Sequence, residues 1–257
     1  MKLKESSCVP AVASEQSSSD SFAWNLKGHY LNSRVLSLLF LLTSLLFPLT
    51  SVSQTRQQWR DSLEVLNGKI RKDPNNLHLH LLKAEANINL DQWDYALAEY
   101  GKILHADENN LAALYFRAYV HTQQHHYDLA KVDYEAFIRL EPSHLEAHIG
   151  LAHVLQKLGR KTETMDELNR MVQLFPDSAE AYAARATYET TQKLYEVALY
   201  DWDEAIKRNP KKAEFGVSKA DLLIRLGRWQ EAKTTLDGVV ARGTPRAALK
   251  EWYDQCK

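Results

Sequence analysis

The chain has 257 residues and carries 32 Lys and Arg against 33 Asp and Glu, so its net charge is -1. This balance lacks the basic excess that marks a nucleic-acid-binding surface, so we expect no nucleic-acid partner. The 2 cysteines, Cys8 and Cys256, lie near opposite ends of the chain. Cysteines so placed form neither the spaced pairs of a metal site nor a disulfide framework, which excludes both kinds of small stapled domain.

The first 30 residues are polar and rich in serine, and they show neither a helical nor a strand period. A segment of this composition buries too little apolar surface to order itself, which predicts a disordered N-terminus over residues 1–30. The basic and apolar pattern that follows begins late for a secretory signal. A translation start near Leu31 is therefore a second hypothesis for this segment.

Residues 31–53 have the composition of a secretory signal peptide. Arg34 precedes the apolar run Leu36–Phe47, and a small-x-small site ends just before Gln54. These are the parts of a cleaved signal. An uncleaved membrane anchor over residues 35–52 is the alternative, although the run is short against the roughly 20 apolar residues that span a bilayer. A buried helix is the third possibility. The sequence thus predicts a periplasmic or extracellular protein, with a single-pass membrane-anchored protein as the alternative.

After this segment, small residues and prolines recur with a period of 34 residues. The three series are Ala84, Ala118, Ala152, Ala186 and Ala220, then Ala96, Ala130, Ala198 and Ala232 with Thr164 in the remaining place, and Pro74, Pro142, Pro176 and Pro210. A fixed period of this length is typical of stacked units that bury their apolar faces on one another.

Each unit is expected to be a hairpin of two helices, which we call the first and second arms. Small alanines let the arms approach to about 8–10 Å, and proline ends the second arm because it cannot continue a helix. The predicted units are residues 77–110, 111–144, 145–178, 179–212 and 213–246. Single capping helices are expected at residues 54–76 and 247–257, because the end units would otherwise expose their stacking faces.

Local signals support these boundaries. Four residues of the kind that cap helices precede first arms, namely Asn76, Asn110, Ser143 and Ser178. Basic and acidic residues recur in register across the arms, and the predicted pairs are Lys83 with Glu99, Arg117 with Asp133, and Arg185 with Asp201. We interpret them as ion pairs that fix the register of each hairpin, worth about 0–1 kcal/mol each if exposed, rather than as a ligand-binding stripe.

Over Leu77–Arg246 the repeated alanines, aromatic residues and prolines resemble the tetratricopeptide repeat family. The resemblance implies an all-α fold, a right-handed superhelix (α-solenoid) of five helix hairpins. It also implies that the first arms line a concave groove that binds a protein or a peptide. The position at which the family usually has tryptophan holds His80, Leu114, His148, Tyr182 and Gly216.

The candidate binding residues are those that the first arms would present to this groove. They are Leu81, Glu85, Ile88, Tyr115, Tyr119, Ile149, His153, Gln156 and Asp221. Their aromatic and aliphatic members suit an extended or helical peptide. The competing interpretation is that Tyr115 and Tyr119 fill gaps between helices. The main hypothesis is a non-catalytic exported scaffold that binds a protein or peptide partner, and the alternative is a membrane-tethered assembly factor.

The 10 histidines are the only basis for a third class, a metal- or small-molecule-binding repeat module. His121 and His125 are four residues apart on a helix, as are His144 and His148, and such pairs can share a metal. A complete site needs three or four convergent ligands, and no acidic residue or cysteine is fixed beside them, so we expect no metal and no cofactor. The sequence has no nucleophile–base pair, HExxH motif or phosphate-binding glycine loop, so we expect no catalytic residues and no enzyme.

Overall fold

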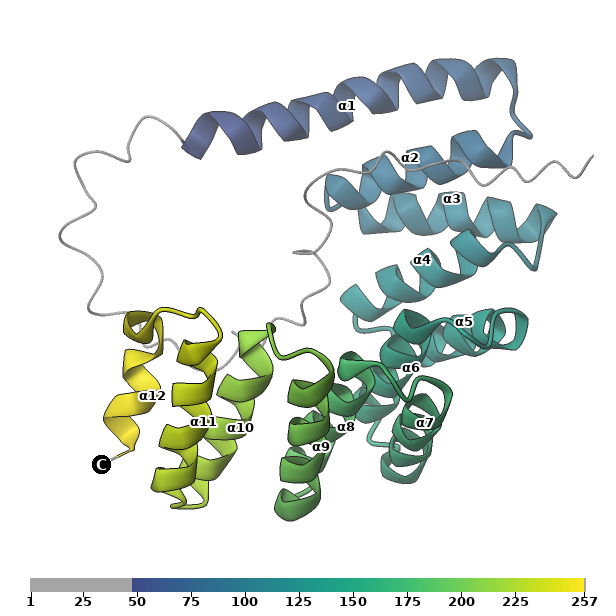
Figure 1. Cartoon of the computed structure of the whole chain (residues 1–257). Coiled ribbons are helices and arrows are strands. Elements are labelled where there is room, and N and C mark those ends of the chain that lie inside the picture. Colours follow the sequence, from purple (N-terminus) through teal and green to yellow (C-terminus); the bar gives the residue numbers. More distant parts are fainter. Residues whose placement is uncertain (1–47, 257) are drawn as a thin grey trace, which may run out of the picture. The chain divides into compact units, whose positions relative to one another are not determined.

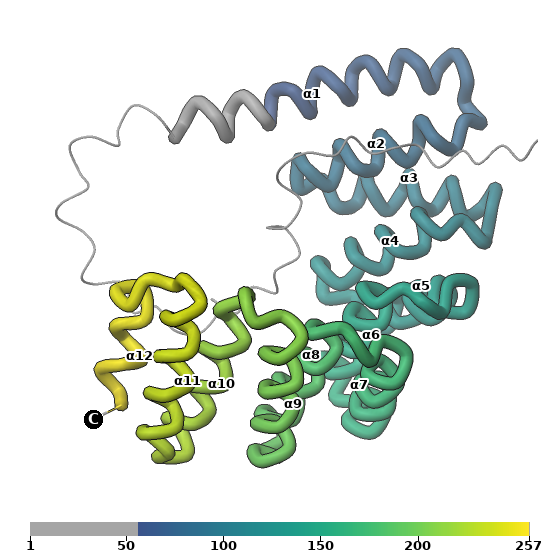
Figure 2. The backbone as a smooth tube through the Cα atoms, in the orientation of Figure 1, coloured from purple at the N-terminus to yellow at the C-terminus, as the bar shows by residue number. Residues whose placement is uncertain are grey.

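The computed structural model describes the backbone of residues 48–256 and the side chains of residues 56–256. The chain divides between Ser53 and Gln54 into two units. The predicted signal run Leu36–Phe47 lies outside the described residues. Every described secondary-structure element is a helix, and α2 to α12 follow one another in chain order (Figures 1 and 2). None of the described helices is both long and apolar enough to span a membrane.

The described helices form five hairpins between single helices. α1 (Pro48–Lys72) comes first, and the hairpins are α2 (Leu77–Asn89) with α3 (Trp93–Ala106), α4 (Leu111–Gln123) with α5 (Tyr127–Leu140), α6 (Leu145–Lys157) with α7 (Lys161–Leu174), α8 (Ala179–Thr191) with α9 (Tyr195–Arg208), and α10 (Ala213–Arg225) with α11 (Trp229–Ala241). The 3-10 turn η2 (Arg246–Leu249) and α12 (Lys250–Gln255) follow. The predicted all-α solenoid of five hairpins is confirmed.

Neighbouring helices pack along the stack in chain order. The two arms of each hairpin pack against each other, and each second arm before the last also packs on the first arm of the next unit. In addition, the first arms α2, α4, α6 and α8 contact one another in series. The first arms of these four units therefore form one continuous surface, and this surface carries most of the predicted binding residues.

The alanine registers lie where the two arms of a hairpin cross. In unit two, Ala118 and Ala130 are fully buried and belong to one apolar cluster. Thr164 breaks the second series but is also buried, and its hydroxyl donates a 2.8 Å hydrogen bond to the carbonyl oxygen of Arg160. A buried hydroxyl that has a hydrogen-bond partner is tolerated, which explains why threonine replaces alanine here.

The five hairpin turns share a left-handed backbone residue. These residues are Asp91 (φ 59°), His125 (φ 61°), Gly159 (φ 72°), Lys193 (φ 63°) and Gly227 (φ 71°). Left-handed φ favours glycine, yet three of these five residues carry side chains. In each turn the next N–H closes the helix end, as at His126, which donates a 2.8 Å bond to the carbonyl oxygen of His121. Packing of the arms thus imposes the turn geometry.

The first arms begin with side-chain caps that were largely expected. Asn76, Asn110 and Ser178 each accept a hydrogen bond from the backbone N–H three residues later. The expectation for Ser143 was wrong. The next residue, His144, is the cap, and its Nδ1 accepts a 3.2 Å bond from the N–H of Ala147. Imidazole nitrogen replaces the usual hydroxyl or amide oxygen at this helix start.

The three predicted ion pairs between arms are present. Lys83 Nζ lies 3.0 Å from Glu99 Oε1, Arg117 binds Asp133 through bonds of 2.7 and 2.6 Å, and Arg185 binds Asp201 through bonds of 2.6 and 2.9 Å. Their carboxylates are at most 3% exposed, so these are not surface pairs. Removing one partner of a buried pair leaves an uncompensated charge and costs about 3–5 kcal/mol, so each pair strongly constrains hairpin register.

Glu189 adds a second carboxyl group to the pair in unit four. It is 3% exposed, and its Oε2 has no hydrogen-bond partner. Burial, and then the adjacent charge of Asp201, raise the pKa of Glu189 to about 7, against the opposing effect of Arg185. At neutral pH the carboxyl group therefore carries its proton in a large share of the molecules.

His148 is a second buried group whose protonated form is favoured in the folded state. Its Nδ1 contacts the carboxylate of Glu167, and its Nε2 lies 2.9 Å from the carbonyl oxygen of Pro142. Both partners accept hydrogen bonds, so the imidazole bonds to both when both of its nitrogens carry protons. Burial disfavours the charged ring, but the bonds to Glu167 and Pro142 outweigh it and raise the pKa of His148.

Stability is expected to fall with rising pH between about 6.5 and 8, because below that range the lowered pKa values of His121 and His153 add stability as pH rises and oppose the effect of Glu189. The folded-state pKa of Glu189 is raised to about 7, so ionisation in this range removes stability that is present at lower pH. The raised pKa of His148 acts in the same direction, because its contribution is lost as the ring deprotonates. The pKa of Glu99 is held low, because hydrogen bonds from His80 and Lys83 outweigh burial. Protonation of Glu99 therefore destabilises the fold only on the acid side of this window.

Thermal melts of the parent and of Glu189→Gln across this pH range check the prediction. Glutamine mimics the protonated carboxyl group, so the variant should lose much of the pH dependence and exceed the parent in stability by about 2–3 kcal/mol near pH 8. Glu214 is exposed, and Glu214→Gln is the matched control that should follow the parent. A difference in melting temperature between the parent and Glu189→Gln that does not change between about pH 5 and pH 8 would contradict the expectation.

Gly150 on α6 makes room for Tyr134 of α5. A Cβ at Gly150 would lie 2.5 Å from Tyr134 Cζ, and Tyr134 is 3% exposed. Gly150→Ala should therefore destabilise the fold by about 1–3 kcal/mol, measured by denaturant unfolding. Gly101 is the matched control, because a Cβ there would meet nothing within 4 Å. Gly101→Ala should stabilise its helix by up to about 1 kcal/mol, and equal effects of the two changes would refute the close contact.

Candidate functional site

The candidate site is the surface of the first arms α2, α4, α6, α8 and α10, which we call the first-arm face. All nine predicted binding residues lie on these helices: Leu81, Glu85 and Ile88 on α2, Tyr115 and Tyr119 on α4, Ile149, His153 and Gln156 on α6, and Asp221 on α10. Because α2, α4, α6 and α8 contact one another in series, residues of the first three units share one surface.

Three of these residues form an apolar patch across units one and two. Leu81, Ile88 and Tyr119 are half-buried and pack against the same apolar cluster, which includes Ala113 and Val120. Burial raises the pKa of Tyr119, so its phenol is uncharged at neutral pH. The packed sides of these residues hold them in place, and their partly exposed side chains are uncharged, although the exposed Glu85 lies between Leu81 and Ile88 on the same face of α2.

Tyr115 lies in a different environment from Tyr119. Its ring centroid lies 6.0 Å from that of Tyr134, 5.5 Å from that of Phe137 and 5.3 Å from that of His144. Burial, followed by the charge of Glu146, raises the pKa of Tyr115 to about 12. These contacts join α4 to α5 and to the start of α6. The competing interpretation of Tyr115, as a residue that fills a gap between helices, accounts for its main contacts.

Unit three continues the first-arm face with little charge. Ile149 is half-buried against the cluster around Met171, and Gln156 is exposed. Glu85, on α2 of unit one, is exposed as well. Burial, and then the nearby Lys157, lower the pKa of His153 to about 4. The imidazole of His153 is therefore neutral at physiological pH, as suits a surface that receives uncharged groups.

Asp221 stands apart from the other candidates. It lies on α10 of unit five and forms a 2.7 Å ion pair with Arg225 on the same helix. This pairing occupies its carboxylate within its own unit. The structure therefore brings together the candidates of units one to three and leaves Asp221 outside that group.

Sequence reasoning missed the role of two buried histidines. His80 and His148 are 6% and 1% exposed, and their Nδ1 atoms contact Glu99 and Glu167. A sequence signal was present, since histidine and glutamate recur at the same two register positions in units one and three. These contacts assign both histidines to packing between arms rather than to ligand binding.

The other histidines do not converge on a metal site. Among the described residues, no group of three or more His, Cys, Asp or Glu side chains is arranged to hold a metal ion. The rings of His121 and His126 lie 5.9 Å apart, and His125 Nδ1 lies 2.7 Å from the hydroxyl of Tyr127. A ring contact joins His121 to His126 and a hydrogen bond joins His125 to Tyr127, whereas the buried Nδ1 of His121 has no hydrogen-bond partner among the described residues.

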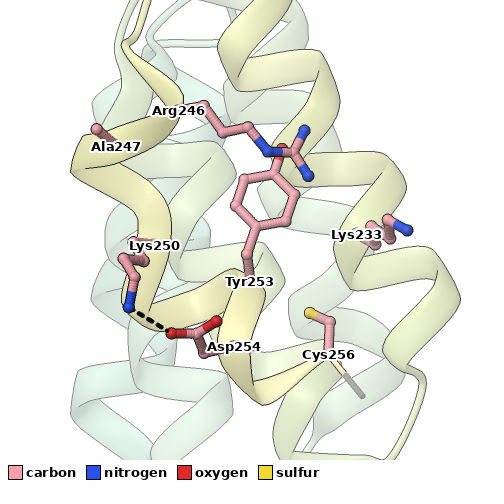
Figure 3. A pocket seen from close by; sticks show the side chains of 7 residues that line it. All are labelled: Lys233, Arg246, Ala247, Lys250, Tyr253, Asp254 and Cys256. Carbon is pink, nitrogen blue, oxygen red and sulfur yellow. Dashed lines mark hydrogen bonds and ion pairs between the residues drawn. The ribbon is translucent and has the colours of Figure 1, made fainter.

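A hollow of about 510 Å³ lies at the C-terminal end, beside α11 and α12. Arg246 lies over the ring of Tyr253, and in Figure 3 Ala247 and Lys250 lie on one side of that ring and Lys233 and Cys256 on the other. The guanidinium is 3.9 Å from the ring centroid and forms a 3.1 Å ion pair with Asp237. Burial raises the pKa of Cys256 although Lys233 opposes this, so the thiol stays protonated. These contacts serve the packing of the C-terminal cap.

The sequence comparison identifies a family within the repeats. Residues 121–188 match a family model described as tetratricopeptide repeat. This match covers the end of unit two, all of unit three and the first part of unit four. A search of curated proteins found no significant match.

Solved structures with the same fold cover more of the chain. MamA protein superposes with a TM-score of 0.56 at 19% identity over 65% of this chain and 91% of that chain. A tetratricopeptide repeat protein from Parabacteroides merdae gives 0.56 at 17% identity over 79% of both chains, and YrrB gives 0.53 at 20% identity over 70% of this chain and 93% of that chain. At these identities the likeness establishes the fold. The chain thus has the fold of tetratricopeptide repeat solenoids, and its residues 121–188 also match the sequence pattern of that family.

Proposed function

We propose that the chain is a non-catalytic, exported scaffold that binds a protein or a peptide through the first-arm face of units one to three. The observation that carries the proposal is the apolar patch of Leu81, Ile88 and Tyr119. These side chains are half-buried within one cluster, and α2 and α4, which bear them, are in contact. Large side chains that are fixed by packing and still partly exposed make effective anchors, because binding orders them little further.

The flanking residues are consistent with a peptide ligand. Ile149 and the neutral His153 add uncharged side chains from unit three, while the exposed Glu85, between Leu81 and Ile88, and the exposed Gln156 offer hydrogen-bond acceptors. A few polar groups around an apolar strip suit a peptide that is read by its alternate side chains. Among the structural relatives, YrrB is described as a tetratricopeptide repeat protein with an unusual peptide-binding site, which supports the same general mode here.

Tyr119 provides the direct test. Crosslinking in cells followed by mass spectrometry first identifies the partner, and its affinity for the parent and for Tyr119→Ser is then measured. Tyr119→Ser should weaken binding by at least about 2 kcal/mol, measured at a temperature at which the variant is fully folded, because loss of its half-buried packing should also lower the melting temperature. Tyr95 on α3 is 67% exposed, and Tyr95→Ser is the matched control that should bind as the parent does. Parental affinity in Tyr119→Ser, or equal losses in both variants, would overturn the proposal.

Export is the second part of the proposal. Its support is the basic residue, the apolar run Leu36–Phe47 and the small-x-small site before Gln54, and the second compact unit of the chain also begins at Gln54. N-terminal sequencing of the protein recovered from cells should therefore start at Gln54. Recovery of an intact apolar run in the membrane fraction would contradict cleavage and favour the membrane-tethered alternative.

A further inference from the structure

A pocket of about 270 Å³ opens in unit two, beside the segment that leads into α4. Leu114, Ala136 and Leu140 supply its apolar part, and Glu108, Asn109 and Arg139 supply its polar part. Leu114 is 4% exposed and forms the floor, whereas Leu140 is 42% exposed. The repeats allow a direct comparison, because every lining residue has a counterpart in the same register of the other units.

In unit four the corresponding place is filled by side chains. Tyr182 stands at the position of Leu114, and Arg208 stands at the position of Leu140. The guanidinium of Arg208 lies 3.9 Å from the Tyr182 ring centroid and donates a 3.0 Å hydrogen bond to its hydroxyl. Arg208 also donates a 2.6 Å bond to the carbonyl oxygen of Pro176, the counterpart of Glu108. An aromatic ring and a hydrogen-bond donor thus occupy this place together.

Units one and three fill the same place with imidazole. His80 and His148 occupy the position of Leu114, and their Nε2 atoms each lie 2.9 Å from the carbonyl oxygen of Pro74 and Pro142, respectively. In units one, three and four, therefore, the carbonyl oxygen at the position of Glu108 accepts a hydrogen bond from a planar side chain.

Unit five fills the place by another route. Gly216 and Gly238 stand at the positions of Leu114 and Ala136, and Arg242 stands at the position of Leu140. A Cβ at Gly216 would lie 3.7 Å from Arg242 Nη2, and one at Gly238 would lie 3.4 Å from Arg242 Nη1. Val239, whose Cγ2 would clash with a Cβ at Gly216, takes the space beside that glycine, and the guanidinium of Arg242 lies over both glycines.

In unit two, Leu114 and Ala136 are smaller than their counterparts in units one, three and four, and no other side chain fills the space. Leu114 lacks the ring found in units one, three and four, and Ala136 stands where those units carry Lys102, Arg170 and Glu204. Leu140 carries no donor that could reach the carbonyl oxygen of Glu108. We propose that this pocket receives an aromatic side chain of the peptide partner, one with a donor edge such as the phenol of tyrosine or the indole of tryptophan.

The donor edge follows from the other units, in which an N–H group meets the carbonyl oxygen at the position of Glu108. The ring follows from the imidazole, phenol and guanidinium groups that fill the same place in units one, three and four, and Leu114, Ala136 and Leu140 would contact it in unit two. Assigning the side chain to a peptide rests on the proposed function. The pocket would then set specificity for one residue of the ligand, while the first-arm face contributes most of the contact area.

Titration of the full chain with N-acetyltyrosinamide and N-acetyltryptophanamide tests the pocket without knowledge of the partner. Both probes should shift the methyl NMR signals of Leu114, Ala136 and Leu140, and N-acetylleucinamide should not. Leu114→Tyr places the residue of unit four in unit two, so it should weaken probe binding by at least about tenfold without lowering the melting temperature. If this variant is poorly folded, Ala136→Glu introduces the residue of unit four from the second arm and serves instead.

Equal shifts with the leucine probe, or undiminished binding of the aromatic probes to the filled variant, would overturn the pocket. Tyr119→Ser separates this proposal from the proposed function, because it should leave probe binding unchanged. If Tyr119→Ser loses partner capture and the parent binds neither aromatic probe, only the pocket proposal is contradicted. If Tyr119→Ser captures the partner fully and Leu114→Tyr does not, the first-arm face is contradicted and the pocket is supported.

Discussion

The structure depends on the close approach of two helices at buried alanines. Ala118 and Ala130 show it in unit two, where both are fully buried, and the same register recurs in the other hairpins. Close approach brings the backbones together, and the buried ion pairs then prevent one arm from sliding along the other. Because a buried carboxylate requires its partner, Arg117 and Asp133 define a single register. The small side chain of the alanines thus sets how closely the two arms approach, and the buried ion pair sets their register.

Function resides where the repeats differ from one another. The alanine registers are nearly uniform, but the position of Leu114 holds a different residue in almost every unit. Most of these residues connect the segment before a hairpin to its second arm, with imidazole in units one and three and with a phenol bonded to Arg208 in unit four. Unit two departs from this pattern and also contributes Tyr119 to the first-arm face. Both candidate contact regions therefore involve the same hairpin.

The sequence predicted the architecture well because its period reflects packing that every unit repeats. The first arms begin at Leu77, Leu111 and Leu145 as the period implies, and the ion pairs between arms were correct. The cap at Ser143 was wrong, because serine and histidine are adjacent and only the backbone geometry decides between them. Tyr115 was assigned to the binding surface on helical periodicity alone, which does not reveal neighbours on α5. The pocket was not predictable, since it results from what several side chains fail to fill.

The connection into unit two has a mechanical consequence. Units one, three and four are entered through segments that contain a proline and whose carbonyl oxygen is tied to a planar side chain. The segment before α4 has Glu108 in the place of proline and Leu114 in the place of the ring. The φ torsion at residue 108 is therefore less restricted, although Asp107 accepts hydrogen bonds from the N–H of Asn109 and from the side-chain amide of Asn110. A ligand group bound in the pocket would take the place of the missing ring and restrain this segment as His80 and His148 restrain theirs.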